Sequence, residues 1–235
     1  MTLDGRIADC RGGSKWITSE AARREVQEIR RRHSAIVIGK GTLACDDPKL
    51  TARCGKRTYY PARIVFSPDD NIPQGSYFCK HCDETRSIVV VRDSGVGAPP
   101  RGRGRAVSNC EECGELTRSA INRTSPASGG NGEGGIELWR AKSANDAECI
   151  NAFLDMAYDQ GLSGVLVEGG QRLASAFLEN GFVNKLYLFY GNKMFGAGYD
   201  GLVFSKGLSV NESIVLNNVT HRSFGDNFLV TGYVK

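Results

Sequence analysis

A carboxylate and a glycine pair follow an apolar stretch in residues 164–178, "GVLVEGGQRLASAFL". The apolar residues predict a short buried strand, and the residues after the glycines predict a helix. Such a helix start offers unpaired backbone N–H groups and the positive end of the helix dipole, which together favour a phosphate or pyrophosphate. Glu168 ends the predicted strand, where open α/β sheets bind their ligands. The alternative is an ordinary strand-to-helix turn with an exposed glutamate.

A second glycine-rich turn, "GKGTLA" at residues 39–44, also follows an apolar strand and formally matches the dinucleotide pattern G-x-G-x-x-G/A. Pro48 follows closely, so no long helix can continue and a normal Rossmann unit is not expected. The turn therefore either binds a nucleotide in another geometry or is an ordinary turn. Asp46 and Asp47 could supply an acid, although such residues before a proline more often shape a turn.

Several arginines and a tryptophan could recognise a phosphorylated ring. Arg30, Arg31 and Arg32 end a predicted helix, and with Arg53 they offer guanidinium groups suited to bidentate phosphate binding. The alternative is that they are solvated charges at a helix end. Trp16 follows "GGSK" on a predicted loop, where its ring could stack on a planar ligand or pack against the protein.

Two C-x-x-C pairs have the spacing with which two thiolates bind one tetrahedral zinc ion. Because thiols stay reduced inside cells, metal binding is a better first interpretation than disulfides. We expect a structural Zn²⁺ site, with free thiols as the alternative and a redox pair less favoured. A closed four-thiolate site would leave no open position for catalysis. The predicted ligands are Cys79, Cys82, Cys110 and Cys113.

Composition excludes several classes of protein. The 235 residues are 40% hydrophobic and 24% charged, which is typical of an ordinary globular protein. No apolar run approaches bilayer-spanning length, so no membrane partner is expected. The N-terminal residues lack a secretion signal, which favours a cytoplasmic location. A net charge of +4 does not call for nucleic acid as a partner, but it suits a site that receives phosphates.

Alternating strands and helices predict an α/β protein with a mostly parallel sheet. The last strand is expected to close this sheet as an antiparallel member. Residues 95–135 are so rich in Gly, Pro, Ser and charge that they predict a mobile insertion. Helices are expected at residues 19–33, 144–160 and 171–180, and strands at residues 35–38, 63–66, 87–91, 137–139, 164–167, 185–190 and 228–234.

Four longer segments together resemble the pyrimidine reductase of riboflavin biosynthesis, the reductase half of the bacterial deaminase-reductase. The segments are "MTLDGRIA", "GGSKWITSEAARREVQEIR", "GKGTLACDDPKLTAR" and "VLVEGGQRLASAFLENGFVNKLYLF". The resemblance covers about residues 1–54 and 135–235. It implies a dihydrofolate-reductase-like three-layer sandwich, with a mostly parallel central sheet and an antiparallel C-terminal strand. Residues 1–235 would form one reductase domain with a cysteine-bearing insertion at about residues 79–134.

The resemblance implies NADPH-dependent reduction of 5-amino-6-(5-phosphoribosylamino)uracil to its ribityl product. Arg30 and Arg53 would bind the 5′-phosphate, and Glu168 would accept hydrogen bonds from the pyrimidine. We expect Lys15, with Asp46, to be catalytic, assisting ring opening or proton delivery. The implied substrate contacts are Ser14, Lys15, Arg30, Leu50, Arg53 and Glu168. The implied cofactor contacts are Trp16, Thr42, Asp46, Gly170, Gln171, Arg172, Leu173, Ala174, Ser175 and Ala176.

The chain also departs from this family. The zinc signature of the deaminase half is absent, so we expect no deamination and consider a separate deaminase as a partner. The family usually has most of a first strand before "MTLDGRIA", so the start is either trimmed or that edge differs. The family often has Asp-Ser-Arg where this chain has Ser67, Pro68 and Asp69, which leaves NADPH or NADH open. A homodimer is expected from the resemblance alone.

Two rival interpretations remain. The first is a reductase of the same fold that acts on the undeaminated pyrimidine or on a pterin. The second is a non-catalytic, zinc-stapled nucleic-acid-binding protein that uses "RGRGR" and the cysteine pairs. It predicts salt-sensitive nucleic-acid binding without cofactor affinity, and the intact cofactor and substrate motifs weigh against it.

Overall fold

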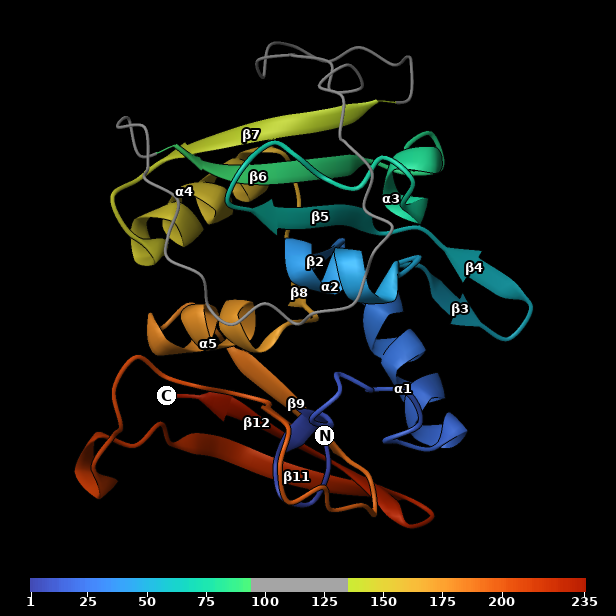
Figure 1. The fold of residues 1–235 in the computed structure, drawn as a ribbon, viewed down its shortest axis with the longest axis vertical. Helices are drawn as coiled ribbons and strands as arrows, with labels where there is room; N and C mark the ends of the chain where they lie inside the picture. Colours follow the sequence, from blue (N-terminus) through green and yellow to red (C-terminus); the bar gives the residue numbers. More distant parts are fainter. Residues whose placement is uncertain (94–134) are drawn as a thin grey trace. The chain divides into compact units, whose positions relative to one another are not determined.

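A computed structural model describes residues 1–93 and 135–235 of the chain (Figure 1). The described residues divide into two compact units. The hairpin unit comprises Met1–Arg32, Thr51–Tyr59 and Gly169–Lys235. The parallel-sheet unit comprises His33–Leu50 and the described part of Tyr60–Glu168. Residues 94–134 lie outside the described residues, and they include Cys110, Cys113 and most of the insertion predicted at about residues 79–134.

The parallel-sheet unit contains a five-stranded sheet in the order β7-β6-β5-β2-β8, with every neighbouring pair parallel. Strands covered on both faces carry continuous apolar runs, and β2 and β6 have such runs. The five strands predicted here are confirmed, although β6 and β7 are longer than expected. Their bounds are β2 Ala35–Gly39, β5 Ala62–Ser67, β6 Ser87–Asp93, β7 Ile136–Lys142 and β8 Val165–Val167.

Helix α4, Asp146–Asp159, packs against β7 and contributes four buried residues, Cys149, Ile150, Phe153 and Ala157. Asn145 caps its N-terminus, because the Asn145 side chain accepts a hydrogen bond from the Glu148 amide at 2.9 Å. Phe153 is fully buried, and its ring meets the edge of Phe66 with centroids 5.0 Å apart. The helix predicted at residues 144–160 is therefore confirmed. Two shorter helices complete the unit, α2 at Lys40–Asp46 and α3 at Tyr77–Lys80.

The hairpin unit contains a three-stranded antiparallel sheet in the order β11-β12-β9. Its strands are β9 Lys185–Tyr190, β11 Leu216–Phe224 and β12 Asn227–Val234. The C-terminal strand is antiparallel, as predicted, but it pairs with β11 and β9 and does not close the parallel sheet. A two-residue turn with Gly225 at φ 63° joins β11 to β12, which makes β11 the nearest available partner.

Helices α1, Glu20–Arg31, and α5, Gln171–Glu179, also belong to the hairpin unit and confirm two predicted helices. The Ser19 hydroxyl caps α1 by accepting a hydrogen bond from the Ala22 amide. The sequence did not predict the short paired strands of this unit. They are β1 Arg6–Ala8 with β10 Tyr199–Asp200, and β3 Ala52–Cys54 with β4 Arg57–Tyr59.

No helix in residues 1–93 or 135–235 is long and apolar enough to cross a membrane. Helix α4, with 14 residues, falls well short of the about 20 residues that a bilayer-spanning helix needs.

Candidate functional site

Two glycines with positive φ precede α5 in the hairpin unit. Gly169 has φ 145° and Gly170 has φ 67°, conformations in which any other L-residue would be strained. Gly170 is the N-cap and offers no side chain to the first-turn amides. A nine-residue helix with this uncapped start presents N–H groups and the positive end of its dipole to an anion.

The body of α5 limits how the predicted cofactor contacts could act. Ser175 is buried, and its hydroxyl accepts a hydrogen bond from the Val203 amide at 2.8 Å. Its side chain therefore holds the loop around Val203. Arg172, in contrast, is exposed. The remaining predicted contacts, Gln171, Leu173, Ala174 and Ala176, are half-buried along the same helix.

Trp16 has an exposed side chain on an unusual backbone. Its side chain is 69% exposed and its φ is 67°, a left-handed conformation that costs about 1–3 kcal/mol for a non-glycine residue. Ser14 is half-buried and Lys15 is exposed on the same loop. The Asp9 carboxylate shapes this loop by accepting hydrogen bonds from the amides of Arg11 and Gly13, at 2.8 Å and 2.9 Å.

The two arginines predicted to bind phosphate lie on elements that pack together within the hairpin unit, α1 and β3. Arg30 donates a hydrogen bond from Nη1 to the Thr51 carbonyl at 3.0 Å. The Arg53 amide donates to Gln27 at 2.9 Å, while the Arg53 side chain is exposed. These contacts fix the backbone of β3 against α1 and leave the Arg53 guanidinium open to solvent.

In the parallel-sheet unit, Glu168 directly follows β8, and its amide donates to the Val37 carbonyl of β2 at 2.8 Å. Lys40 follows β2, and its ammonium lies 2.6 Å from the Asp69 carboxylate, two residues after β5. Carboxyl ends of adjacent parallel strands share one edge of a sheet, the edge where α/β proteins bind ligands. Sequence reasoning missed the Lys40–Asp69 pair, although Lys40 and Asp69 come two and three positions after strands predicted to end at residues 38 and 66.

The other predicted residues of this unit lie on or just after α2. The helix has only seven residues and stops where Asp47 takes a left-handed conformation, as the nearby proline suggested. The Asp47 carboxylate accepts a hydrogen bond from the Tyr77 amide at 2.7 Å, which gives it the turn-shaping role. Thr42 is half-buried and Asp46 is exposed. Leu50 is 1% exposed, so its side chain belongs to the core.

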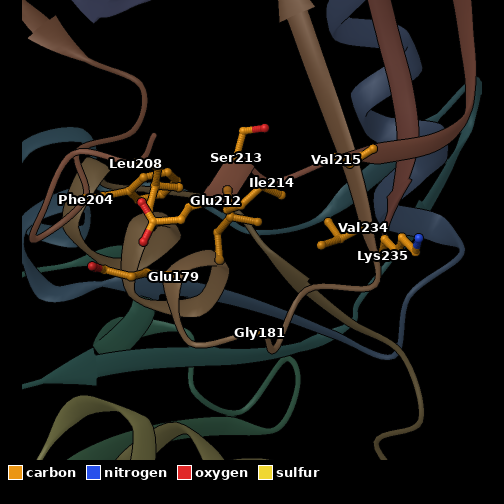
Figure 2. Close-up of a pocket in the computed structure, with 11 residues that line it drawn as sticks. Glu179, Gly181, Phe204, Leu208, Glu212, Ser213, Ile214, Val215, Val234 and Lys235 are labelled. Carbon is orange, nitrogen blue, oxygen red and sulfur yellow. The ribbon is translucent and has the colours of Figure 1, made fainter. Parts of the chain in front are cut away.

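A pocket near the C-terminal end of α5 does not contain any predicted site residue (Figure 2). Leu178, Leu208 and Ile214 form part of its apolar lining, and the carboxylates of Glu179 and Glu212 also line it. A helix C-terminus carries partial negative charge, and two carboxylates add to it. Lys235 also lines the pocket and opposes this negative charge. Because the pocket contains no predicted site residue, we do not assign the dinucleotide to it.

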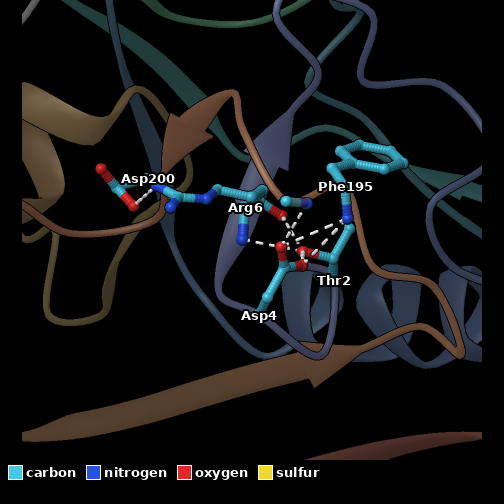
Figure 3. A network of polar contacts seen from close by, with 6 residues as sticks. Thr2, Asp4, Arg6, Phe195 and Asp200 are labelled. Carbon is cyan, nitrogen blue, oxygen red and sulfur yellow. Dashed lines mark hydrogen bonds and ion pairs between the residues drawn. The ribbon is translucent and has the colours of Figure 1, made fainter.

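The carboxylate of Asp4 accepts several hydrogen bonds in the hairpin unit (Figure 3). A hydrogen bond from the Thr2 hydroxyl, at 2.6 Å, and the amides of Phe195 and Gly196 lower the pKa of Asp4 to about 2. Nearby, Arg6 forms an ion pair with Asp200 between β1 and β10. This network fixes the first strand to the loop after β9, and it contains none of the predicted site residues.

Among the described residues, no group of three or more His, Cys, Asp or Glu side chains is placed to bind a metal ion. Cys79 lies on α3 and Cys82 follows it, and both pack against the hydrophobic core. Burial raises the pKa of the Cys79 thiol. Because Cys110 and Cys113 lie outside the described residues, the four-cysteine zinc site stays a prediction.

The parallel sheet, the flanking helices and the separate antiparallel strands define a mixed α/β protein with a dihydrofolate-reductase-like fold, as predicted. A family model described as the RibD C-terminal domain matches residues 1–95 and 145–230. The chain belongs to this family, and the resemblance stated from its motifs is confirmed.

Three relatives illustrate the similarity. The riboflavin biosynthesis protein RibD of Aquifex aeolicus is 25% identical over 231 residues, which cover 98% of this chain and 54% of that protein. A crystal structure of a deaminase/5-amino-6-(5-phosphoribosylamino)uracil reductase from Thermotoga maritima is 29% identical with a TM-score of 0.66, and the match covers 100% of this chain and 54% of that one. The yeast riboflavin biosynthesis reductase Rib7 shares the fold, with a TM-score of 0.64, 15% identity and coverage of 100% and 86%. The chain thus spans about half the length of its bacterial RibD relatives.

Proposed function

We propose that the chain catalyses NADPH-dependent reduction of 5-amino-6-(5-phosphoribosylamino)uracil to 5-amino-6-(5-phosphoribitylamino)uracil in riboflavin biosynthesis. The observation that carries the proposal is the family match, whose span includes every residue predicted to contact substrate or cofactor. The uncapped start of α5 after Gly169 and Gly170 supports it, because this backbone fits a pyrophosphate.

The reaction needs both a hydride and a proton. The bound nicotinamide would supply the hydride to C1′ of the ribosyl group. As the bond between C1′ and the ring oxygen breaks, that oxygen takes up a proton, and we assign its delivery to Lys15 with Asp46. Lys15 is exposed on a loop shaped by Asp9, which suits a group that must reach a ligand.

The remaining predicted residues would recognise the substrate through their charges and hydrogen-bonding groups. Arg30 and Arg53 would bind the 5′-phosphate, since guanidinium groups match its oxygens in pairs. Glu168 would accept hydrogen bonds from the pyrimidine N–H groups. Ser14 would contact the substrate through its hydroxyl, and Leu50 through its backbone, because the Leu50 side chain is buried.

The Lys15 assignment is tested by replacing Lys15 with Met. We expect kcat to fall by about 10²-fold or more, because general acid–base groups contribute at least that much. The matched control is Arg11→Met, which removes a positive charge from the same exposed loop and should leave kcat unchanged. Near-normal turnover of the Lys15 variant would remove this residue from the mechanism.

The choice of NADPH is tested by comparing kcat/KM for NADPH and NADH. Asp69 stands where the family often has an arginine, and it pairs with Lys40. Lys40 could bind a 2′-phosphate only if it were released from Asp69, so an Asp69→Asn variant should shift the preference further toward NADPH. A preference for NADH in the unsubstituted protein would contradict the cofactor assignment.

The remaining expectations are proposals of the same kind. We propose one cytoplasmic reductase domain that forms a homodimer and works with a separate deaminase, as well as a structural zinc ion on Cys79, Cys82, Cys110 and Cys113. Light scattering tests the dimer. Metal analysis of the purified protein tests the zinc, which should be lost from a Cys79→Ser variant.

The rival enzyme would use the same fold on the undeaminated pyrimidine or a pterin, and it is distinguished by which substrate is turned over. A non-catalytic nucleic-acid-binding protein is less favoured. Such a protein would not need the glycine pair before α5. Both glycines have positive φ, a conformation that strains any L-residue.

A further inference from the structure

The indole of Trp16 is exposed, but the backbone that carries it is held in place. The Lys193 ammonium donates a hydrogen bond to the Trp16 carbonyl at 2.7 Å. This contact joins residues 177 positions apart in the chain and secures a peptide with φ 67°. A bulky residue keeps such a conformation only where its surroundings over-determine it, and such strain is concentrated at functional sites.

The residues after Trp16 are anchored as firmly. Ile17 is buried, and Gly191 packs so closely on the Ile17 carbonyl that an added Cβ would lie 1.9 Å from its oxygen. The Ser19 amide donates to the side chain of buried Asn227 at 2.7 Å. The backbone around Trp16 is therefore rigid, and the remaining freedom of this segment lies in the indole side chain.

Arg23, in the first turn of α1, restricts that side chain. Its guanidinium carbon lies 4.3 Å from the centroid of the Trp16 ring, and its Nη1 donates to the Thr18 carbonyl at 3.1 Å. The neighbouring Arg24 behaves differently, because it forms an exposed ion pair with Glu20 at 3.0 Å on the helix surface. Of these adjacent arginines, Arg23 is the one tethered over the indole.

We propose that Arg23 is a positioning residue that holds the Trp16 indole as a fixed surface on which a planar ring of the dinucleotide stacks. The inference rests on the proposed function, which supplies the ligand. A guanidinium over an indole is attractive, and a side chain ordered before binding loses less conformational entropy when the ligand arrives. Arg23 thus acts on the ligand through Trp16.

The contact itself is tested without ligand by ¹⁹F NMR of protein labelled with 5-fluorotryptophan. The chain has two tryptophans, so a Trp16→Phe variant assigns both signals. Arg23→Met should shift and sharpen the Trp16 signal, because the ring gains freedom, and should leave that of Trp139 in place. The matched control Arg24→Met removes the same charge from the same helix and should move neither signal.

The role in binding is tested by calorimetry with NADPH and with its fragment 2′-phospho-ADP-ribose, which lacks the nicotinamide. We expect Arg23→Met to weaken NADPH binding by about two- to tenfold relative to Arg24→Met, with Arg23→Lys in between. The KM for NADPH should rise while kcat changes little, a split that general loss of structure would not give. An equal loss for the fragment would place the adenine on Trp16, and an unchanged fragment affinity would place the nicotinamide there.

Three results would overturn the proposal. The first is an Arg23→Met protein with the NADPH affinity of the Arg24→Met control. The second is an unchanged Trp16 signal after loss of Arg23, which would mean that Arg23 does not hold the ring. The third is an unsubstituted protein that binds neither NADPH nor NADH. This last result would refute the proposed function as well, whereas the first two would leave it standing.

Discussion

The two units differ in how their strands are covered. In the parallel-sheet unit, four of the five residues of β2 are buried, as are the first five of β6. In the hairpin unit, seven of the nine residues of β11 are exposed. Successive side chains of a strand point to opposite faces, so β11 is exposed on both faces, whereas β2 and β6 are covered on both faces. The hydrophobic driving force is therefore concentrated in the parallel-sheet unit, and the hairpin unit relies more on tight turns, close backbone contacts and polar networks.

The two units also differ in where their predicted ligand-contacting groups lie. The predicted groups of the hairpin unit, such as Trp16, Lys15 and Arg53, are exposed on loops or short strands. Those of the parallel-sheet unit, such as Glu168, lie just beyond the ends of strands of the parallel sheet. Substitutions in the core of the parallel-sheet unit should therefore mainly lower the free energy of unfolding. Substitutions at the backbone contacts of the hairpin unit should also change ligand binding.

The largest expected effect is in the core of the parallel-sheet unit. Phe153→Ala removes a fully buried ring that packs on Phe66, and it should lower the free energy of unfolding by about 3–5 kcal/mol. The contrasting variant Val219→Ala truncates a side chain of β11 that is 55% exposed, and it should change stability by less than about 0.5 kcal/mol. Urea denaturation measures the free energy of unfolding of both variants. Equal losses in the two variants would contradict the proposed difference between the units.

The next effect tests the backbone contacts of the hairpin unit. A Cβ at Gly191 would lie 1.9 Å from the Ile17 carbonyl oxygen, so Gly191→Ala must displace backbone and should cost about 1–3 kcal/mol or more. It should also raise the KM for the cofactor, because Ile17 adjoins Trp16. The control is Gly164→Ala in the other unit, where the nearest atom would lie at an ordinary 3.6 Å. A Gly191→Ala protein as stable as this control would contradict the account.

The smallest effect concerns the polar network of the hairpin unit. The pKa of Asp4 is lowered from 3.8 to about 2 by the Thr2 hydroxyl and two backbone amides, so the unfolded state binds this proton more readily. The stabilisation is complete above pH 3.8 and is lost as the pH falls toward about 2. Melting temperatures of the unsubstituted protein and of Asp4→Asn should differ at pH 6 and converge at low pH. A constant difference across this range would show that the charge of Asp4 is not responsible.

The same contrast explains what could be predicted from the sequence. Strands β2 and β6 of the parallel-sheet unit contain continuous apolar runs such as "IVVV", and all five strands of that unit were predicted. Strand β11, "LNNVTHRSF", is mostly polar and exposed, so its sequence has no alternation of apolar and polar residues that would predict a strand. It pairs with β12 through the tight turn at Gly225. Strands β1, β3 and β10 have only two or three residues and, unlike the equally short β8 with its sequence "VLV", they are not apolar runs.

The candidate site was predictable where local sequence sets local geometry. The glycine pair before α5 and the turn at Asp47 were visible as motifs, and both have the expected conformations. The left-handed backbone of Trp16 was not visible, since Lys193 secures it from a distant part of the chain. Burial of Ser175 and Leu50 was missed for the same reason, because tertiary packing decides which face of a segment meets the ligand.

The most direct test of the central claim is the oxidation of NADPH by the purified protein with freshly prepared 5-amino-6-(5-phosphoribosylamino)uracil. The undeaminated pyrimidine, NADH and a pterin serve as parallel substrates. We predict turnover of the uracil with NADPH, with the phosphoribityl product formed in equal amount to the cofactor oxidised. A folded protein that turns over none of these substrates and binds neither cofactor would contradict the assignment as a reductase.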